Sequence, residues 1–108
     1  MNGVPEISVQ DLPADAVLLD VREQDEWDAG HIEGAMHLPM GDVPARLGDL
    51  PEADPLYIVC RSGNRSGRAA AWLNAQGIDS VNVAGGMKAW AIAGKPMESA
   101  SGSTPTVI

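Results

Sequence analysis

The sequence contains a single cysteine, Cys60, and only two histidines, His31 and His37, among 108 residues. A lone cysteine cannot form an internal disulfide, so its thiol is free either to be inert or to react. The scattered side chains include no paired spacing such as Cys-x-x-Cys or His-x-x-x-His, so no metal site is expected.

Long apolar runs are also missing. No stretch approaches the roughly 20 consecutive apolar residues of a membrane helix, and the N-terminus lacks the basic start and apolar run of a secretory signal. We therefore expect a cytoplasmic protein. The length predicts one domain over residues 1–98. A flexible C-terminal tail is expected over residues 99–108, because Ser-Ala-Ser-Gly-Ser-Thr-Pro has no apolar periodicity.

Basic residues are scarce: the sequence has 7 Lys and Arg residues against 15 Asp and Glu residues, which gives a net charge of -8. This balance argues against nucleic acid or an anionic membrane as a partner. Residues 55–78 contain Arg61, Arg65 and Arg68 but no acidic residue, so removing this +3 from -8 leaves -11 for the rest. Cys60 therefore lies in the one basic segment of an acidic chain.

The pattern of apolar residues predicts an α/β domain. Two short, nearly continuous apolar runs, residues 17–21 and 56–60, are typical of strands buried on both faces. Shorter candidate strands are residues 7–9, 35–38 and 80–83. Segments compatible with helices alternate with them at residues 23–29, 42–47, 66–76 and 87–93. This alternation predicts a central parallel sheet of about five strands flanked by helices.

The helix over residues 66–76 is the clearest of these predictions. Ala69, Trp72 and Leu73 have the spacing of a core-facing stripe. Ser66 is a suitable N-cap, and Gly77 is well placed to end the helix in a left-handed turn.

The surroundings of Cys60 indicate chemistry. A predicted buried strand ends at Cys60, and a tight polar loop leads into the next helix, at the end of the sheet where ligands collect. The N–H groups of such a loop and of a helix start form a cradle for anions, which lowers the pKa of a thiol. In the alternative interpretation, Cys60 is simply the last apolar residue of a strand. Gly63, two arginines, a capping serine and the lack of acidic residues directly after Cys60 favour the reactive thiol.

The loop Cys60-Arg61-Ser62-Gly63-Asn64-Arg65-Ser66 closely resembles the active-site loop of the rhodanese family of thiosulfate sulfurtransferases. Three more segments resemble family motifs: residues 18–22 followed by Glu26-Trp27, residues 30–35, and Ala84-Gly85-Gly86 with Trp90. Together the motifs span roughly residues 5–97. Glu33 stands where the family often has proline, which predicts a looser turn.

The resemblance implies a rhodanese-like three-layer domain and a two-step reaction. The thiolate of Cys60 is expected to take the outer sulfur of a small anionic donor such as thiosulfate or a related persulfide, with loss of sulfite in the first case. The Cys60 persulfide then passes this sulfur to a thiol, to cyanide or to a protein such as thioredoxin. No cofactor is implied.

The same resemblance assigns roles to individual positions. The expected substrate-binding residues are Arg61, Ser62, Gly63, Asn64, Arg65 and Ser66. Arg61 and Arg65 are the natural partners of a sulfonate group, because arginine presents a fixed fork of donors. The alternative role for either arginine is to shift charge or to pair with a surface carboxylate, and the donor geometry favours a ligand role for Arg65. Asp20 and Arg22 are expected to be structural support, pinning loops through hydrogen bonds rather than moving protons.

For the other side chains near these motifs we expect structural roles or exposure to solvent. His31 is expected to be a turn residue rather than a base, and Trp27 and Trp90 are expected to be packing anchors. Arg68 is expected to be solvated or ion-paired. The acidic helix over residues 23–29 fits either a solvated face or a surface for a basic partner.

Three other functions remain open at this point. Phosphatases and arsenate reductases of similar design have an arginine six residues after the cysteine, where this chain has Ser66. The arginine here is Arg65, one residue too early to bind a tetrahedral oxyanion in the usual way. A non-catalytic binding module would not need the cysteine and the loop arginines. A persulfide carrier or redox sensor also fits an accessible thiol, which a second molecule would have to reduce because the chain lacks another cysteine.

Overall fold

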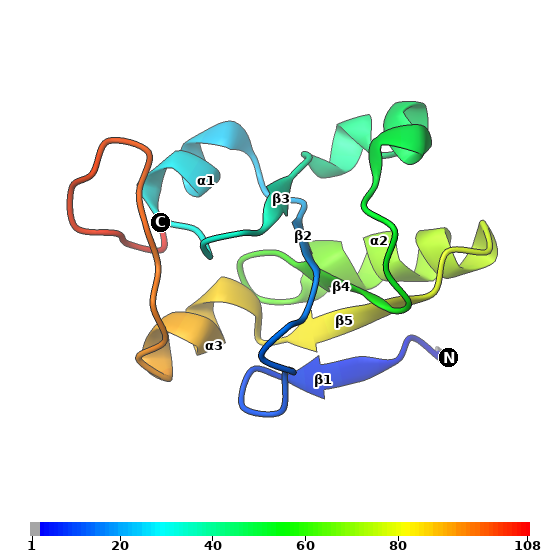
Figure 1. Cartoon of the computed structure of the whole chain (residues 1–108), viewed down its shortest axis with the longest axis horizontal. Coiled ribbons are helices and arrows are strands. Elements are labelled where there is room, and N and C mark those ends of the chain that lie inside the picture. The colour runs from blue at the N-terminus through cyan, green and yellow to red at the C-terminus, as the bar shows by residue number, and fades with distance from the viewer. Residues whose placement is uncertain (1–2) are drawn as a thin grey trace.

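A computed structural model describes residues 3–108 and contains one sheet of five strands. The strands are β1 (Glu6–Ser8), β2 (Leu18–Asp20), β3 (Met36–His37), β4 (Leu56–Val59) and β5 (Ser80–Ala84). All four pairings are parallel, in the order β1-β5-β4-β2-β3 (Figure 1). The predicted parallel sheet is confirmed, and the strand that leads into Cys60 lies at its centre.

Between and after the strands, residues 3–108 form three α-helices and two short 3-10 helices. The helices are α1 (Gln24–Ala29), α2 (Asn64–Ala75) and α3 (Gly86–Ile92), and the 3-10 segments are η1 (Met40–Asp42) and η2 (Pro44–Asp49). The segment predicted as helical at residues 42–47 is thus 3-10 in character, with non-helical backbone at Arg46. No helix within residues 3–108 combines the length and the apolar content needed to cross a membrane.

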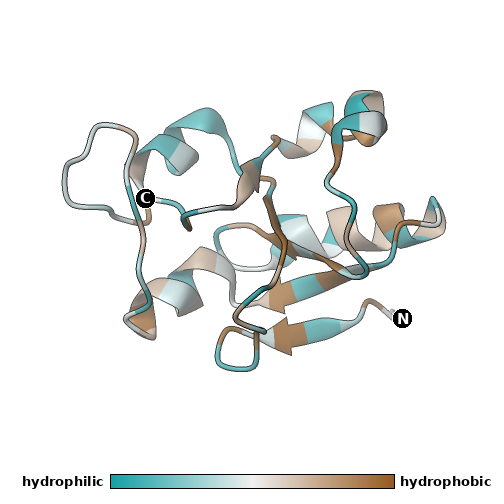
Figure 2. Ribbon diagram, viewed as in Figure 1, coloured by the Kyte–Doolittle hydropathy of each residue, from teal (hydrophilic) through white to brown (hydrophobic). Residues whose placement is uncertain are grey.

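Two hydrophobic cores lie against the sheet, because alternate side chains of a strand point to opposite faces. Leu19 and Ile58 join the core that contains Leu73 of α2, whereas Leu18 and Val59, their chain neighbours, join the core that contains α3. The hydrophobic colours concentrate in the strands, and α1 is hydrophilic (Figure 2). This arrangement is the three-layer α/β fold expected from the sequence.

The start of α2 corrects one prediction. The N-cap is Gly63, whose φ of 104° only glycine adopts readily, and the helix begins at Asn64. Ser66, expected to be the N-cap, instead lies in the first turn with its side chain fully buried. Because the loop after Cys60 is shorter than predicted, the hydroxyl of Ser66 is not used for capping.

The core-facing stripe of α2 is also displaced from the prediction. Its buried residues are Ser66, Ala69, Ala70 and Leu73. Trp72 is 37% exposed, because the turn that directs Ser66 toward the sheet directs Trp72 partly to solvent. Gly77 has a φ of +85° just beyond the helix, as predicted.

The C-terminal segment lies beside α1 (Figure 1). The N–H of Thr106 donates to the carbonyl oxygen of Ala29 at 2.9 Å, and Val107 packs against the core of α3. The carbonyl oxygen of Ile108 accepts a hydrogen bond from Nε of Arg61 at 2.9 Å. Flexibility of residues 99–108 stays a prediction.

Candidate active site

The thiol of Cys60 lies in a loop that the sheet and α2 hold from both sides. Cys60 directly follows β4 and is 1% exposed. The chain then turns at Gly63, whose N–H donates to Sγ of Cys60 at 3.1 Å. A Cβ atom at Gly63 would lie 3.3 Å from the backbone nitrogen of Gly85. The positive φ therefore favours glycine at the turn, and the backbone of Gly85 leaves little room for a Cβ atom.

A chain of polar side chains continues from the sulfur to β5. The hydroxyl oxygen of Ser66 lies 3.2 Å from Sγ of Cys60 and 2.6 Å from Oδ1 of Asn82. Nδ2 of Asn82 donates to the carbonyl oxygen of Gly63 at 3.1 Å and to a carboxylate oxygen of Glu6 at 2.7 Å. Asn82 therefore holds both the turn and the serine that contact the thiol.

These contacts determine the acidity of Cys60. Burial by itself raises the pKa of the thiol, but the hydroxyl and N–H of Ser66 and the N–H groups of Gly63 and Ser62 stabilise the thiolate. The pKa of Cys60 is consequently lowered from its ordinary value. An arrangement of this kind increases the thiolate fraction without a separate base, as is typical of reactive cysteines.

The start of α3 holds the carbonyl side of the same loop. The N–H of Met87 donates to the carbonyl oxygen of Cys60 at 2.8 Å, and the N–H of Lys88 donates to that of Arg61 at 2.9 Å. Gly86 precedes them with a φ of 56°. The Gly-Gly pair seen in the sequence therefore lets the first turn of α3 approach the loop backbone closely.

Arg65 is bound within the chain. Its Nη1 and Nη2 donate to the two carboxylate oxygens of Glu26 at 2.7 and 2.8 Å, which links the first turn of α2 to α1. The side chain hydrogen bond from Arg65 lowers the pKa of Glu26 to about 2, although burial opposes this shift. The same bond raises the pKa of Arg65. A substrate-binding role for Arg65 stays a prediction, and in this structure its fork of donors is occupied.

The other expected binding residues of the loop differ in exposure. Arg61, Ser62 and Asn64 are exposed. Of their three side chains, only that of Arg61 donates a hydrogen bond within the described residues, from Nε to an oxygen of Ile108. Ser66 contacts the sulfur rather than solvent. The structure thus places three polar side chains on the outside of the loop and one beneath it.

Asp20 and Arg22 form a buried ion pair at the end of β2. Nε of Arg22 donates to Oδ1 of Asp20 at 2.9 Å, and Nη2 donates to Oδ2 at 2.7 Å. Nη2 also donates to the carbonyl oxygen of Gly30 at 2.8 Å. Nη1 has no partner among the described residues. The pair thus ties the end of a strand to the segment after α1.

The aromatic residue of the Glu-Trp motif packs against both histidines. The ring of Trp27 stacks on His31 with 3.7 Å between centroids and on His37 with 4.8 Å. His31 is 6% exposed, with Nδ1 2.7 Å from the carbonyl oxygen of Trp27. Nε2 of His37 lies 2.8 Å from the carbonyl oxygen of Arg22. Within residues 3–108 neither imidazole hydrogen-bonds to the thiol, and these contacts hold β3 and the segment before it against Trp27.

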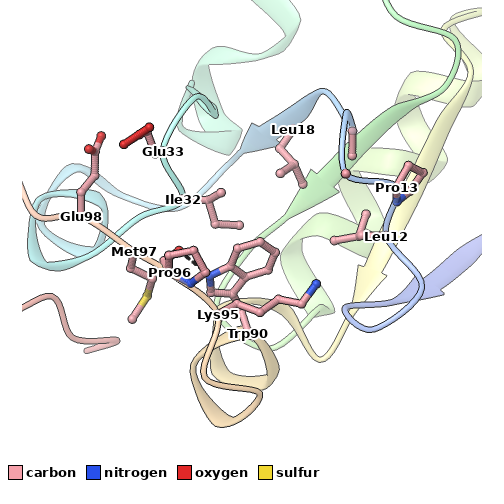
Figure 3. Close-up of a pocket in the computed structure, with 12 residues that line it drawn as sticks. Leu12, Pro13, Leu18, Ile32, Glu33, Trp90, Lys95, Pro96, Met97 and Glu98 are labelled. Carbon is pink, nitrogen blue, oxygen red and sulfur yellow. Dashed lines mark hydrogen bonds between the residues drawn. The ribbon is translucent and has the colours of Figure 1, made fainter.

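A separate groove of about 400 Å³ opens at the end of α3 (Figure 3). Trp90 and Lys95 line it together with Leu18 and Ile32, and Nζ of Lys95 lies 4.8 Å from the centre of the Trp90 ring. No residue of the segment 60–66 lines this groove. Within residues 3–108, no group of three or more His, Cys, Asp or Glu side chains is placed to hold a metal ion.

Comparisons with known proteins agree with this architecture. The profile of the rhodanese-like domain family matches residues 8–93. The putative sulfur carrier protein YrkF of Bacillus subtilis is 41% identical over 96 residues, which cover 82% of this chain and 52% of YrkF. The chain thus spans about half the length of that relative. A sulfurtransferase of Allochromatium vinosum is 40% identical over 89 residues, covering 82% of this chain and 83% of that protein.

A solved structure gives the same result. The crystal structure of a rhodanese-related protein from Thermoplasma volcanium superposes with a TM-score of 0.80 at 29% identity, covering 86% of this chain and 96% of that one. The family profile covers most of the chain, and the solved structure has the same fold. The protein therefore belongs to the rhodanese-like domain family.

Proposed function

We propose that this protein is a sulfurtransferase in which Cys60 carries the transferred sulfur as a persulfide. The observation that supports this proposal most directly is the set of hydrogen bonds to the sulfur of Cys60, from the N–H of Gly63 at 3.1 Å and the hydroxyl of Ser66 at 3.2 Å. A cysteine that only fills a core does not need donors aimed at its sulfur. Relatives named sulfurtransferase and sulfur carrier protein support the same reaction class.

In the first step, the thiolate of Cys60 attacks the outer sulfur of a donor such as thiosulfate. A bond forms between Sγ and that sulfur, the sulfur–sulfur bond of thiosulfate breaks, and sulfite leaves with the electron pair. The product is a Cys60 persulfide anion, so atoms and charge balance without an external oxidant or reductant. The loop N–H groups that stabilise the thiolate are suited to hold this anion as well.

In the second step, an acceptor nucleophile attacks the outer sulfur of the persulfide. Cyanide becomes thiocyanate, and a thiolate becomes a persulfide, while Cys60 leaves as the thiolate. Because the covalent intermediate separates the two half-reactions, ping-pong kinetics are expected. A thiol on a protein such as thioredoxin is the proposed acceptor alongside small thiols.

The burial of Cys60 limits which donors fit. With the residue 1% exposed, a donor has to present a slender terminal sulfur to the loop. The exposed groups of Arg61, Ser62 and Asn64 are then the ones placed to meet the rest of the donor. Such access favours thiosulfate and persulfides over donors whose sulfur is flanked by bulky groups on both sides.

Intact-mass measurement of the purified chain after incubation with thiosulfate tests the proposal. We expect a gain of one sulfur atom, reversed by cyanide with release of thiocyanate. Cys60→Ser is the control and is expected to keep its mass while showing the same circular dichroism as the wild type. An unchanged wild-type mass with thiosulfate and with glutathione persulfide would contradict the proposal. Robust phosphate release from a phosphate ester would support the phosphatase alternative instead.

A further inference from the structure

Two loop arginines are predicted to grip an anionic donor, but one of them is already neutralised by an anchored carboxylate. The two carboxylate oxygens of Glu26 accept hydrogen bonds from the two terminal nitrogens of Arg65, at 2.7 and 2.8 Å. The side chains are 13% and 30% exposed, so solvent screens the pair only in part. The positive charge of Arg65 is therefore offset where the donor has to approach.

Glu26 is not free to leave this position. Its Oε1 also accepts the N–H of Glu23 at 3.0 Å, in the capping box that begins α1. Because the capping box already fixes the side chain of Glu26, little further conformational entropy is lost when it pairs with Arg65. Arg65 would have to break two charge-assisted bonds to reach a donor.

The remaining positive groups of the loop are few. Arg61 is exposed, and it uses only Nε for Ile108 within the described residues. Apart from Arg61, the loop can bind a sulfur donor only through its backbone N–H groups, which carry partial positive charges. Because Glu26 offsets the charge of Arg65, Arg65 adds little positive charge at the entrance, which suits a singly charged donor better than a dianion.

We propose that Glu26 is a specificity-determining residue, which holds Arg65 in a neutral pair and makes the site favour sulfur donors with one negative charge, such as persulfides, over dianionic thiosulfate. This inference rests on the proposed function, because it concerns the first half of the same reaction. Arg65 is accordingly a positioning residue for α2, and Arg61 is the arginine left to meet an anionic donor.

Two donors that differ by one charge test the inference. Thiosulfate is a dianion, and methanethiosulfonate has a methyl group in place of one charged oxygen. Each transfers its outer sulfur to a thiolate and releases sulfite or methanesulfinate. The readout is the ratio of the two rates of Cys60 persulfide formation, thiosulfate over methanethiosulfonate, followed by intact mass. A general loss of folding would slow both donors and leave this ratio unchanged.

Four variants are expected to affect the ratio of the two rates differently. Glu26→Gln frees the charge of Arg65 and is expected to raise the ratio roughly three- to ten-fold, the effect of one nearby charge in a partly screened site. Arg65→Met leaves Glu26 uncompensated and is expected to lower the ratio by a similar factor. The double variant restores a neutral pair and is expected to return within about two-fold of the wild type. Asp25→Asn, on an exposed side chain of the same helix, removes one negative charge that is not part of the pair with Arg65 and is the matched control.

The outcomes separate the inference from the proposed function. If neither donor loads wild-type Cys60, the proposed function fails. If both donors load it and Glu26→Gln leaves the ratio unchanged, the role of Glu26 is wrong and the function stands. If the double variant is as poor with thiosulfate as Arg65→Met, Arg65 binds the donor directly and the inference is overturned. Should Glu26→Gln unfold, the double variant, which has no unpaired charge, decides between these results.

Discussion

The hydroxyl oxygen of Ser66 lies 2.6 Å from Oδ1 of Asn82, closer than its 3.2 Å distance to Sγ of Cys60. Nδ2 of Asn82 already donates to Gly63 and Glu6, so Oδ1 can only accept. A hydroxyl has one proton, and it can serve either the amide or the sulfur at a given moment. Ser66 therefore stabilises the thiolate by giving up its bond to Asn82.

Ser66→Ala is expected to raise the pKa of Cys60, because the thiolate loses its side chain donor. The midpoint of the rate of iodoacetamide alkylation against pH should move to higher pH by about one pH unit, the size of a hydrogen bond to a charged group. Asn82→Ala releases the serine proton for the sulfur and should move the midpoint to lower pH. Equal midpoints in wild type and Ser66→Ala would show that the backbone N–H groups alone determine the acidity.

Gly86→Ala is expected to disturb the Cys60 loop by direct contact with its backbone. A Cβ atom there would overlap the carbonyl oxygen of Cys60 and lie 2.7 Å from that of Arg61, and the φ of +56° is itself unfavourable for alanine. We expect a loss of about 2 kcal/mol or more in the free energy of unfolding, together with slower persulfide formation.

Urea denaturation and the intact-mass assay measure the two effects of Gly86→Ala. Gly41→Ala is the control, since a Cβ atom there meets nothing within 4 Å and the backbone does not need glycine. A Gly86→Ala protein as stable and as active as Gly41→Ala would mean that α3 can move away from the loop without cost.

Much of the fold follows from local patterns in the sequence. The apolar runs at residues 17–21 and 56–60 identify the interior strands, because only strands covered on both faces are hydrophobic throughout. The left-handed turn at Gly77 follows from the unique freedom of glycine. The error at Ser66 has a tertiary cause, since a serine looks like an N-cap when the polar chain to Asn82 is unknown.

The candidate site was only partly predictable for the same reason. Cys60 and its loop are contiguous in the sequence, so their chemistry can be inferred from neighbours along the chain. The partner of Arg65 is 39 residues away and on another helix. Asn82 is a buried polar side chain between Val81 and Val83 of β5, and a polar residue between two apolar ones was a sign that β5 contributes to the site.

Asp20→Ala is expected to cost about 3–5 kcal/mol in the free energy of unfolding, because it leaves the guanidinium of Arg22 buried without its counter-charge. Both residues are fully buried. The exposed pair of Arg46 and Asp49, 2.9 Å apart, provides the control, and Asp49→Ala should change stability by less than about 0.5 kcal/mol. Urea denaturation of both variants decides the point, and similar losses for the two would show that burial adds nothing to the inner pair.

The bond between Glu26 and Arg65 also predicts how stability responds to acid. The pKa of Glu26 is about 2 in the folded chain, below its ordinary value of 4.5, so the folded state favours the ionised carboxyl. The resulting stabilisation is fully present above pH 4.5 and is lost as the pH falls toward 2. Glu26→Gln should therefore lower the free energy of unfolding by about 1 kcal/mol at pH 6, given partial exposure of the pair. Near pH 2 the difference should shrink to well under half of that value. Urea denaturation of both proteins across this range measures it, and a difference that stays constant with pH would mean that the carboxylate charge does not stabilise the pair.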